Sequence, residues 1–230
     1  MHESPRPTLK RFWHDPYLSV LETRVARVAG AQVVLEETIF FAESGGQESD
    51  SGTIGPWSVL AARHSGQDIV YTLAPEHGLL SGVPVTVRID WPRRYALMRL
   101  HFAAELVLEL VTQEIPAIEK IGAHIAADKA RIDFAWNENI STLFPLLERR
   151  VDAIVAAAQP IESAFSDPVA QRRYWRIDGF ASVPCGGTHL RHTGEVGALR
   201  FKRRNVGAGK ERIEITLAGM DTEPGASTVR

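Results

Sequence analysis

Two short segments carry the residue types that bind metals or assist hydrolysis. The first is LHFAAEL, residues 100–106, in which His101 and Glu105 are four residues apart inside an apolar run. On a helix this spacing places both side chains on one face. The second is PCGGTH, residues 184–189, in which Cys185 and His189 are also four residues apart. Imidazole, thiolate and carboxylate are the ligands of protein-bound zinc, so the segments indicate two halves of a zinc site.

The same residues also have a simpler interpretation. A histidine in a buried helix is usually a hydrogen-bonded core residue, and a single cysteine usually behaves as a small apolar one. Cys185 is the only cysteine of the chain, so it forms no intrachain disulfide. Spacing alone leaves the metal site and the structural interpretation both open.

The composition is that of an ordinary globular protein. Of 230 residues, 44% are hydrophobic and 23% are charged, and the formal net charge is −2, which argues against disorder and against a disulfide scaffold. The sequence has no apolar run of membrane-spanning length, and its first twenty residues lack the apolar core of a secretory signal. We expect a cytoplasmic protein without membrane association.

The elements that must position these segments fall into two groups. Short apolar or alternating segments with turn residues between them, such as TRVARVAG and AQVVLEETIFF, predict a small antiparallel β-barrel over residues 1–90. Asp90 is placed to cap a helix that runs to Pro116 and is apolar almost all round, which indicates burial. A hairpin, a second helix ending at Pro160 and further strands follow. The predicted class is α+β, with a two-layer α/β domain and an antiparallel sheet over residues 91–230.

Five segments give a more specific indication. FFAESGGQESDSGTIG, RRYALMRLHFAAELV, IGAHIAADKARIDF, PCGGTHLRHTGEVG and GAGKERIEI occur in this order. Together they resemble the editing domain of alanyl-tRNA synthetases and its freestanding AlaX-type relatives, over about residues 24–217. The resemblance implies a β-barrel followed by an editing domain, and hydrolysis of the ester that joins a wrong amino acid, typically serine, to alanine tRNA. The expected partner is the acceptor end of tRNA; no obligate protein partner is evident, and a monomer or a homodimer is expected.

The family binds zinc through H-x-x-x-H on a helix and C-x-x-x-H on a later loop. This chain keeps His101, Cys185 and His189 but has Glu105 in place of the second helical histidine. The preferred interpretation is a zinc site with two histidines, one cysteine and Glu105 as ligands. In a second interpretation, His101, Cys185 and His189 hold the metal, water takes the open position and Glu105 is a catalytic general base. In a third interpretation, the metal is lost and His101 and Glu105 form a buried hydrogen-bonded pair.

Phe102 is the other departure, because the family commonly has threonine there. A phenyl ring cannot hydrogen-bond a serine hydroxyl, so Phe102 is a candidate substrate-contacting residue that changes the preferred amino acid. The alternative is that Phe102 is simply helix core.

The resemblance also assigns roles to two loops. Gln47 is expected to position the substrate and act in catalysis, although a plain β-turn is the simpler interpretation of its loop. Thr188 is a further candidate catalytic residue. The expected substrate-binding residues of the two loops are Ser44, Gly45, Gly46, Gly186 and Gly187.

A basic segment, LRFKRRNVGAGKER at residues 199–212, predicts contact with tRNA phosphates through Arg203, Arg204 and Lys210, assisted by Arg94, Arg191 and His192. The alternative is a solvated strand edge.

Two other functions stay open: a hydrolase of this fold acting on a small-molecule ester or amide, and a non-catalytic tRNA or amino-acid binding module.

Overall fold

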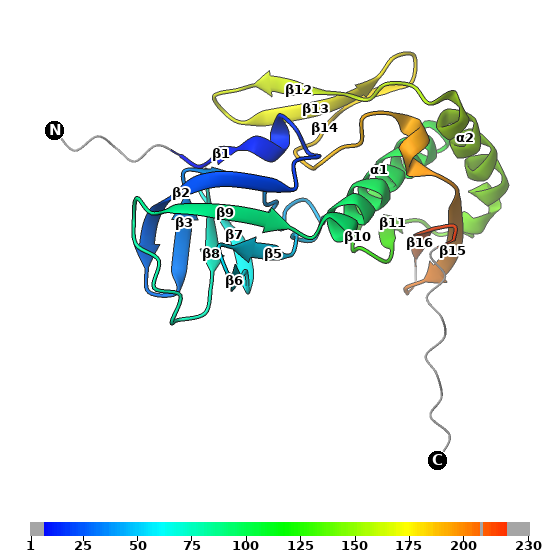
Figure 1. Ribbon diagram of the computed structural model, residues 1–230. Coiled ribbons are helices and arrows are strands. Elements are labelled where there is room, and N and C mark those ends of the chain that lie inside the picture. Colours follow the sequence, from blue (N-terminus) through cyan, green and yellow to red (C-terminus); the bar gives the residue numbers. More distant parts are fainter. Residues whose placement is uncertain (1–6, 208, 220–230) are drawn as a thin grey trace. The chain divides into compact units, whose positions relative to one another are not determined.

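The computed structural model describes residues 7–207 and 209–219. This part of the chain is a mixed α/β structure with mostly antiparallel sheets and two α-helices (Figure 1). It divides into two compact units: residues up to Met98 together with Gly186–His189 form the first, and the other described residues form the second. The boundary expected after Asp90 stays a prediction. No helix among the described residues is both long enough and apolar enough to cross a membrane.

The first unit is built on a curled seven-stranded sheet. Its strand order is β6-β5-β9-β2-β3-β8-β7. The sheet curls where β2 changes partner, from β9 along Val20–Arg24 to β3 along Val25–Ala29, with an irregular register after Val25. Closure of this sheet into the expected barrel stays a prediction. The strands are β2 (Val20–Ala29), β3 (Gln32–Leu35), β5 (Gly52–Ile54), β6 (Trp57–Ser58), β7 (Ala61–Ser65), β8 (Asp68–Thr72) and β9 (Pro84–Ile89).

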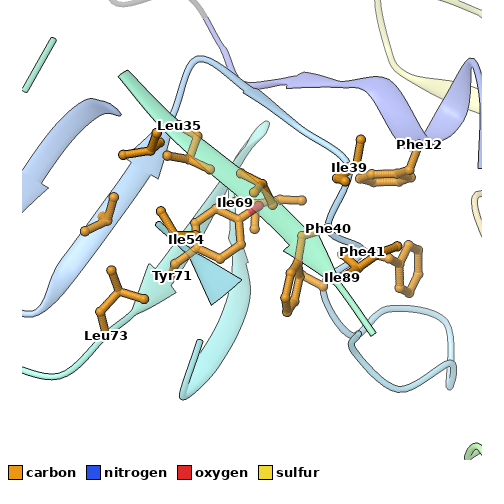
Figure 2. Packing of buried hydrophobic residues seen from close by; sticks show 14 of the residues in the cluster. Phe12, Leu35, Ile39, Phe40, Phe41, Ile54, Ile69, Tyr71, Leu73 and Ile89 are labelled. Atoms are coloured by element: carbon orange, nitrogen blue, oxygen red, sulfur yellow. The ribbon is translucent and has the colours of Figure 1, made fainter. Parts of the chain in front are cut away.

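The core of this unit lies inside the curl. Figure 2 shows Leu35 of β3, Ile54 of β5 and two residues of β8, Ile69 and Tyr71, pointing toward one another. Ile69 and Tyr71 share this side because alternate residues of a strand face the same way. A short parallel pair, β1 (Leu9–Lys10) with β4 (Glu37–Thr38), and a 3-10 turn at Arg11–Trp13 complete the unit.

Arg94 is a structural residue of the first unit, which corrects the expectation that it assists tRNA binding. Its side chain is 0% exposed and forms a two-bond ion pair with Asp50, from Nε to Oδ1 at 2.8 Å and from Nη2 to Oδ2. Two backbone carbonyls, of Pro16 and Ile39, accept its other hydrogen bonds. Loss of one partner from such a buried pair typically costs about 3–5 kcal/mol, so Arg94 stabilises the fold and is not available to phosphates.

The helix α1 (Trp91–Glu114) is buried almost all round, as predicted. The side chain of Asp90 accepts a hydrogen bond from the backbone N–H of Arg93 at 3.1 Å, which caps the helix as expected. Side chains on every side of the helix, including Leu97, Leu100, Phe102 and Val107, are 0% exposed.

The second unit holds two further sheets, which differs from the single antiparallel sheet expected over residues 91–230. A four-stranded antiparallel sheet has the order β10-β11-β16-β15, and a three-stranded one has the order β12-β13-β14. The predicted hairpin and second helix, α2 (Phe144–Ala157), are confirmed. The two-layer arrangement stays a prediction. The strands are β10 (Glu119–Ile125), β11 (Ala130–Ala135), β12 (Glu162–Asp167), β13 (Arg172–Ile177), β14 (Ala181–Pro184), β15 (Leu199–Asn205) and β16 (Lys210–Leu217).

Candidate functional site

The helix α1 brings His101 and Glu105 to one face, as their spacing predicts. His101 is 4% exposed, and its Nε2 lies 3.9 Å from Oε1 of Glu105. The Glu105 side chain is 20% exposed. Polar groups this deep in an apolar helix are costly unless other groups satisfy them, so the surroundings of both residues indicate their role.

The strand β14 delivers Cys185 to this face of the helix. Pairing between β14 and β13 runs to Pro184, and the backbone N–H of Cys185 continues it by donating to the carbonyl of Arg173 at 2.9 Å. The Sγ atom of Cys185 then lies 3.2 Å from Nε2 of His101 and 3.8 Å from Oε1 of Glu105. Residues 84 positions apart in the sequence therefore meet at one point.

Three ligand-type side chains gather there. His101, Cys185 and His189 each offer a ligand atom, and these atoms lie within 4.8 Å of one another. Tetrahedral zinc, with bonds of about 2.0–2.3 Å, separates its ligand atoms by about 3.3–3.8 Å. The donor types suit zinc, and the atoms lie near this separation, with His101 Nε2 and Cys185 Sγ at 3.2 Å, so this group of residues could bind a metal.

The surroundings of His101 favour the form that binds metals. Burial lowers the pKa of His101, and the nearby Glu105 carboxylate raises it by less. The imidazole is therefore neutral near pH 7, which is the ligand form. Close by, burial lowers the pKa of Arg173, and the electrostatic interaction with Cys185 raises it by less. A cation beside the sulfur favours the thiolate that a metal requires.

Trp175 on β13 is a part of the site that our sequence analysis missed. Its indole N–H donates to Oε2 of Glu105 at 3.1 Å, and the side chain is 0% exposed. A buried indole N–H usually needs a hydrogen-bond acceptor. The tryptophan in this predicted strand therefore indicated that an acceptor lies nearby. Nothing in the sequence pairs that tryptophan with Glu105, 70 positions earlier.

Phe102 packs against the same tryptophan. The two ring centroids are 5.1 Å apart at an angle of 68°, an edge-to-face contact, and Phe102 is 0% exposed. This placement supports the helix-core interpretation of Phe102, with Trp175 as its neighbour. Both departures from the family pattern, Phe102 and Glu105, therefore contact one side chain.

Gln47 and Thr188 are brought together within the first unit. The Gln47 side chain is 0% exposed, and its Nε2 donates to Oγ1 of Thr188 at 2.9 Å. Backbone bonds between Ser44 and Gln47, at 3.0 and 3.2 Å, close a turn in which Gly45 and Gly46 have positive φ. The glycines thus form the turn, and the Gln47 side chain leaves it to reach the loop that follows Cys185.

The glycines of that second loop differ in exposure. Gly186 is exposed and Gly187 is buried. A Cβ atom built on Gly186 meets no heavy atom within 4 Å, and the Gly186 carbonyl accepts a hydrogen bond from the Trp13 indole at 3.0 Å. The loop is therefore anchored, with open space beside Gly186.

The basic segment divides between the two faces of β15. Arg203 binds Glu211 through two bonds of 2.5 and 2.6 Å, and Glu211 is only 2% exposed. Arg204 makes a longer contact of 3.3 Å with Glu214, and Lys210 is exposed at the start of β16. Arg203 thus holds the hairpin together.

Two of the assisting residues have a role in local structure. The segment at Thr193–Val196 is a 3-10 turn with His192 at its N-cap. Glu195 accepts hydrogen bonds from the backbone N–H groups of Arg191 at 3.0 Å and His192 at 3.3 Å. Both side chains are exposed, so contact with tRNA stays a prediction.

The sequence is similar to those of known proteins. A family model described as the threonyl and alanyl tRNA synthetase second additional domain matches residues 174–214, which contain Trp175, Cys185 and His189. The alanyl-tRNA editing protein AlaX-M of Pyrococcus horikoshii is 31% identical over 215 residues, covering 91% of this chain and 98% of that protein. The chain belongs to the alanyl-tRNA editing protein family.

Other relatives of this family are consistent with that assignment. AlaX-M of Methanosarcina barkeri is 29% identical over 237 residues, covering 90% of this chain and 97% of that protein. The alanine–tRNA ligase of Ignicoccus hospitalis is 30% identical over 251 residues, which is 96% of this chain but 27% of the ligase. The alignments thus span nearly the full length of these AlaX-M proteins and about a quarter of the ligase.

We predict that the purified protein contains about one zinc ion per chain, because three side chains of zinc-ligand type have their ligand atoms within 4.8 Å of one another. Cys185→Ala and His189→Ala should each lose most of this zinc. The measurement is metal analysis after dialysis against a weak chelator.

His192→Ala is the matched control, since this histidine is close in sequence but is not one of the three grouped residues. It should keep its zinc. Wild-type protein without bound metal would contradict the assignment, and so would equal zinc loss from the His189 and His192 variants.

Proposed function

We propose that this protein hydrolyses the ester bond of mischarged alanine tRNA, with serine or a related small amino acid as the group removed. The observation that carries the proposal is the group formed by His101, Cys185 and His189 in a chain of the alanyl-tRNA editing protein family. The substrate is an activated ester, so the site must position water and stabilise charge on the carbonyl oxygen.

The proposed metal is zinc, held by His101, Cys185 and His189 with Glu105 as a fourth, carboxylate ligand. When bound, zinc would act as a Lewis acid toward the ester carbonyl or would orient the substrate. The residues themselves have separate tasks. Burial keeps His101 neutral and able to bind, and the positive charge of Arg173 favours the Cys185 thiolate.

Gln47 and Thr188 supply substrate positioning in this proposal. The hydrogen bond between their side chains is buried and joins the Ser44–Gln47 turn to the loop that carries His189. The open space beside Gly186 admits a substrate group close to the backbone. An error of about 1 Å in such positioning costs roughly a hundredfold in rate, so the bond has catalytic consequences without contact to the ester.

The exposed face of β15 is the best candidate for the surface that binds tRNA. Arg200, Lys202 and Arg204 alternate along this strand and are exposed. Arg203 faces the other way and is engaged by Glu211, so we propose that Arg200 and Lys202 take its place beside Arg204 and Lys210. Phosphates of the acceptor stem would meet a row of cations on one strand.

We predict that the wild-type protein releases serine from serine-charged alanine tRNA and leaves alanine-charged tRNA intact. The measurement is loss of labelled amino acid from each tRNA, with glycine-charged tRNA as a third substrate. Serine methyl ester is the control that separates tRNA editing from small-molecule esterase activity. Turnover of the free ester at the tRNA rate would contradict the proposal, and so would binding of charged tRNA without turnover.

Gln47→Ala should lower kcat/KM for deacylation by about 10–100-fold, because the loop that carries Thr188 loses its buried anchor. Thr188→Val, which keeps the side-chain shape but removes the hydroxyl, should have a similar effect. If the hydrogen bond is the cause, the double variant is no worse than the stronger single one. Unchanged deacylation of every substrate by Gln47→Ala would refute the positioning role.

Neutralising Arg200, Lys202 and Arg204 to glutamine should weaken tRNA binding and reduce the slope of log affinity against log salt by up to about 3, one per lost phosphate contact. The measurement is a binding titration at several salt concentrations.

The matched control removes three exposed positive charges from other elements, by substituting glutamine for Lys129, Arg149 and Arg172. Its salt slope should equal that of the wild type. Equal slopes for the two triple variants would show that net charge, and not the β15 face, determines binding.

A further inference from the structure

We propose that Trp175 is a positioning residue for the metal site: its indole N–H holds one oxygen of Glu105 so that the other oxygen is directed at the metal. This inference rests on the metal site proposed above. It goes beyond that site because it assigns a task to a residue on a different strand and sets how Glu105 contributes.

The two oxygens of Glu105 have different neighbours. Oε2 accepts the indole hydrogen bond of Trp175 at 3.1 Å. Oε1 lies 3.8 Å from Sγ of Cys185 and 3.9 Å from Nε2 of His101. These distances are close to the separation of about 3.3–3.8 Å between ligand atoms of tetrahedral zinc. A carboxylate held in this way offers a single oxygen to the metal.

The tryptophan is itself firmly held, so its N–H direction is fixed. Trp175 is 0% exposed, with the edge of Phe102 at 5.1 Å and the ring of Phe180 stacked at 6.5 Å and 18°. Its strand pairs on both sides, opposite Ser163 of β12 and Val183 of β14. Outer hydrogen bonds of this kind orient metal ligands, and their loss typically lowers metal affinity by about 10–100-fold.

The chemistry of the indole suits a carboxylate. An indole N–H only donates hydrogen bonds, and an ionised carboxylate only accepts them. The hydrogen bond also stabilises the negative charge of Glu105 beside the sulfur of Cys185. The Cys185 thiol lies 3.8 Å from Oε1 of Glu105 and can donate a hydrogen bond to it. Once the thiol is deprotonated, the thiolate and the carboxylate would together balance the two positive charges of a zinc ion.

The strand β13 contacts the proposed metal ligands through two consecutive residues of its buried face. Arg173 and Trp175 are both buried and lie two residues apart, which places them on one face of the strand. The Arg173 carbonyl fixes the backbone of Cys185, and Trp175 fixes the carboxylate of Glu105. One strand thus orients a ligand from the loop and a ligand from the helix.

The test is metal binding by protein free of tRNA, so it is independent of whether the proposed deacylation occurs. Trp175→Phe keeps an aromatic ring but removes the N–H. It should raise the zinc dissociation constant by about 10–100-fold and change the visible absorption spectrum of the cobalt-substituted protein. Trp57→Phe is the matched control, because it makes the same substitution on β6, a strand that carries none of the residues of the site. Its cobalt spectrum should match that of the wild type.

A double variant separates positioning from packing. If Trp175 acts through Glu105, then Trp175→Phe should change zinc affinity less than about twofold in a Glu105→Ala background. Equal losses in both backgrounds would overturn the proposal. It would also be overturned by a wild-type protein that binds no zinc, or by unchanged affinity and spectrum in Trp175→Phe.

A measurement on the unaltered tryptophan covers the case in which Trp175→Phe does not fold. The indole N–H resonance of Trp175 should shift when zinc is added to the wild-type protein and should shift again in Glu105→Gln. A resonance that responds to neither change would show that the indole does not sense the carboxylate or the metal, and the proposal would fail.

Discussion

The site depends on one constraint, which is that two polar side chains lie in a helix that is buried almost all round. An imidazole and a carboxylate inside an apolar helix are unfavourable unless other groups satisfy them. In α1, His101 and Glu105 meet the sulfur of Cys185 on one side, and Glu105 meets the indole of Trp175 on the other. Apolar side chains such as Leu97 and Leu100 fix the helix, so the polar pair is held where the loop residue arrives.

The proposed metal site and the proposed tRNA-binding surface involve two different sheets. The small sheet β12-β13-β14 surrounds the proposed ligands, because β14 leads into Cys185 while β13 carries Arg173 and Trp175 on its buried face. The larger sheet β10-β11-β16-β15 places cations on the exposed face of β15 and uses Arg203 on the other face to bind Glu211. Alternation along a strand thus assigns neighbouring basic residues to different tasks.

Much of this could be predicted from the sequence, and the rest could not for physical reasons. Helical spacing predicted that His101 and Glu105 share a face, and their burial indicated a partner. Strand alternation could have separated Arg203 from Arg204, but only the fold shows that Glu211 binds Arg203. The bond from Trp175 to Glu105 joins positions 70 residues apart, and the burial of Arg94 depends on Asp50, 44 residues earlier. Such pairs depend on how distant segments pack, which local patterns do not encode.

The central claim is that one helical histidine, one loop cysteine and one loop histidine bind the same zinc ion. X-ray absorption spectroscopy of the zinc-loaded protein tests it most directly, because sulfur and lighter ligands scatter at different distances. The expected result is a single zinc–sulfur distance of about 2.3 Å with the other ligands at about 2.0–2.1 Å, and loss of the sulfur contribution in Cys185→Ala. A spectrum without sulfur in the wild-type protein would contradict the account.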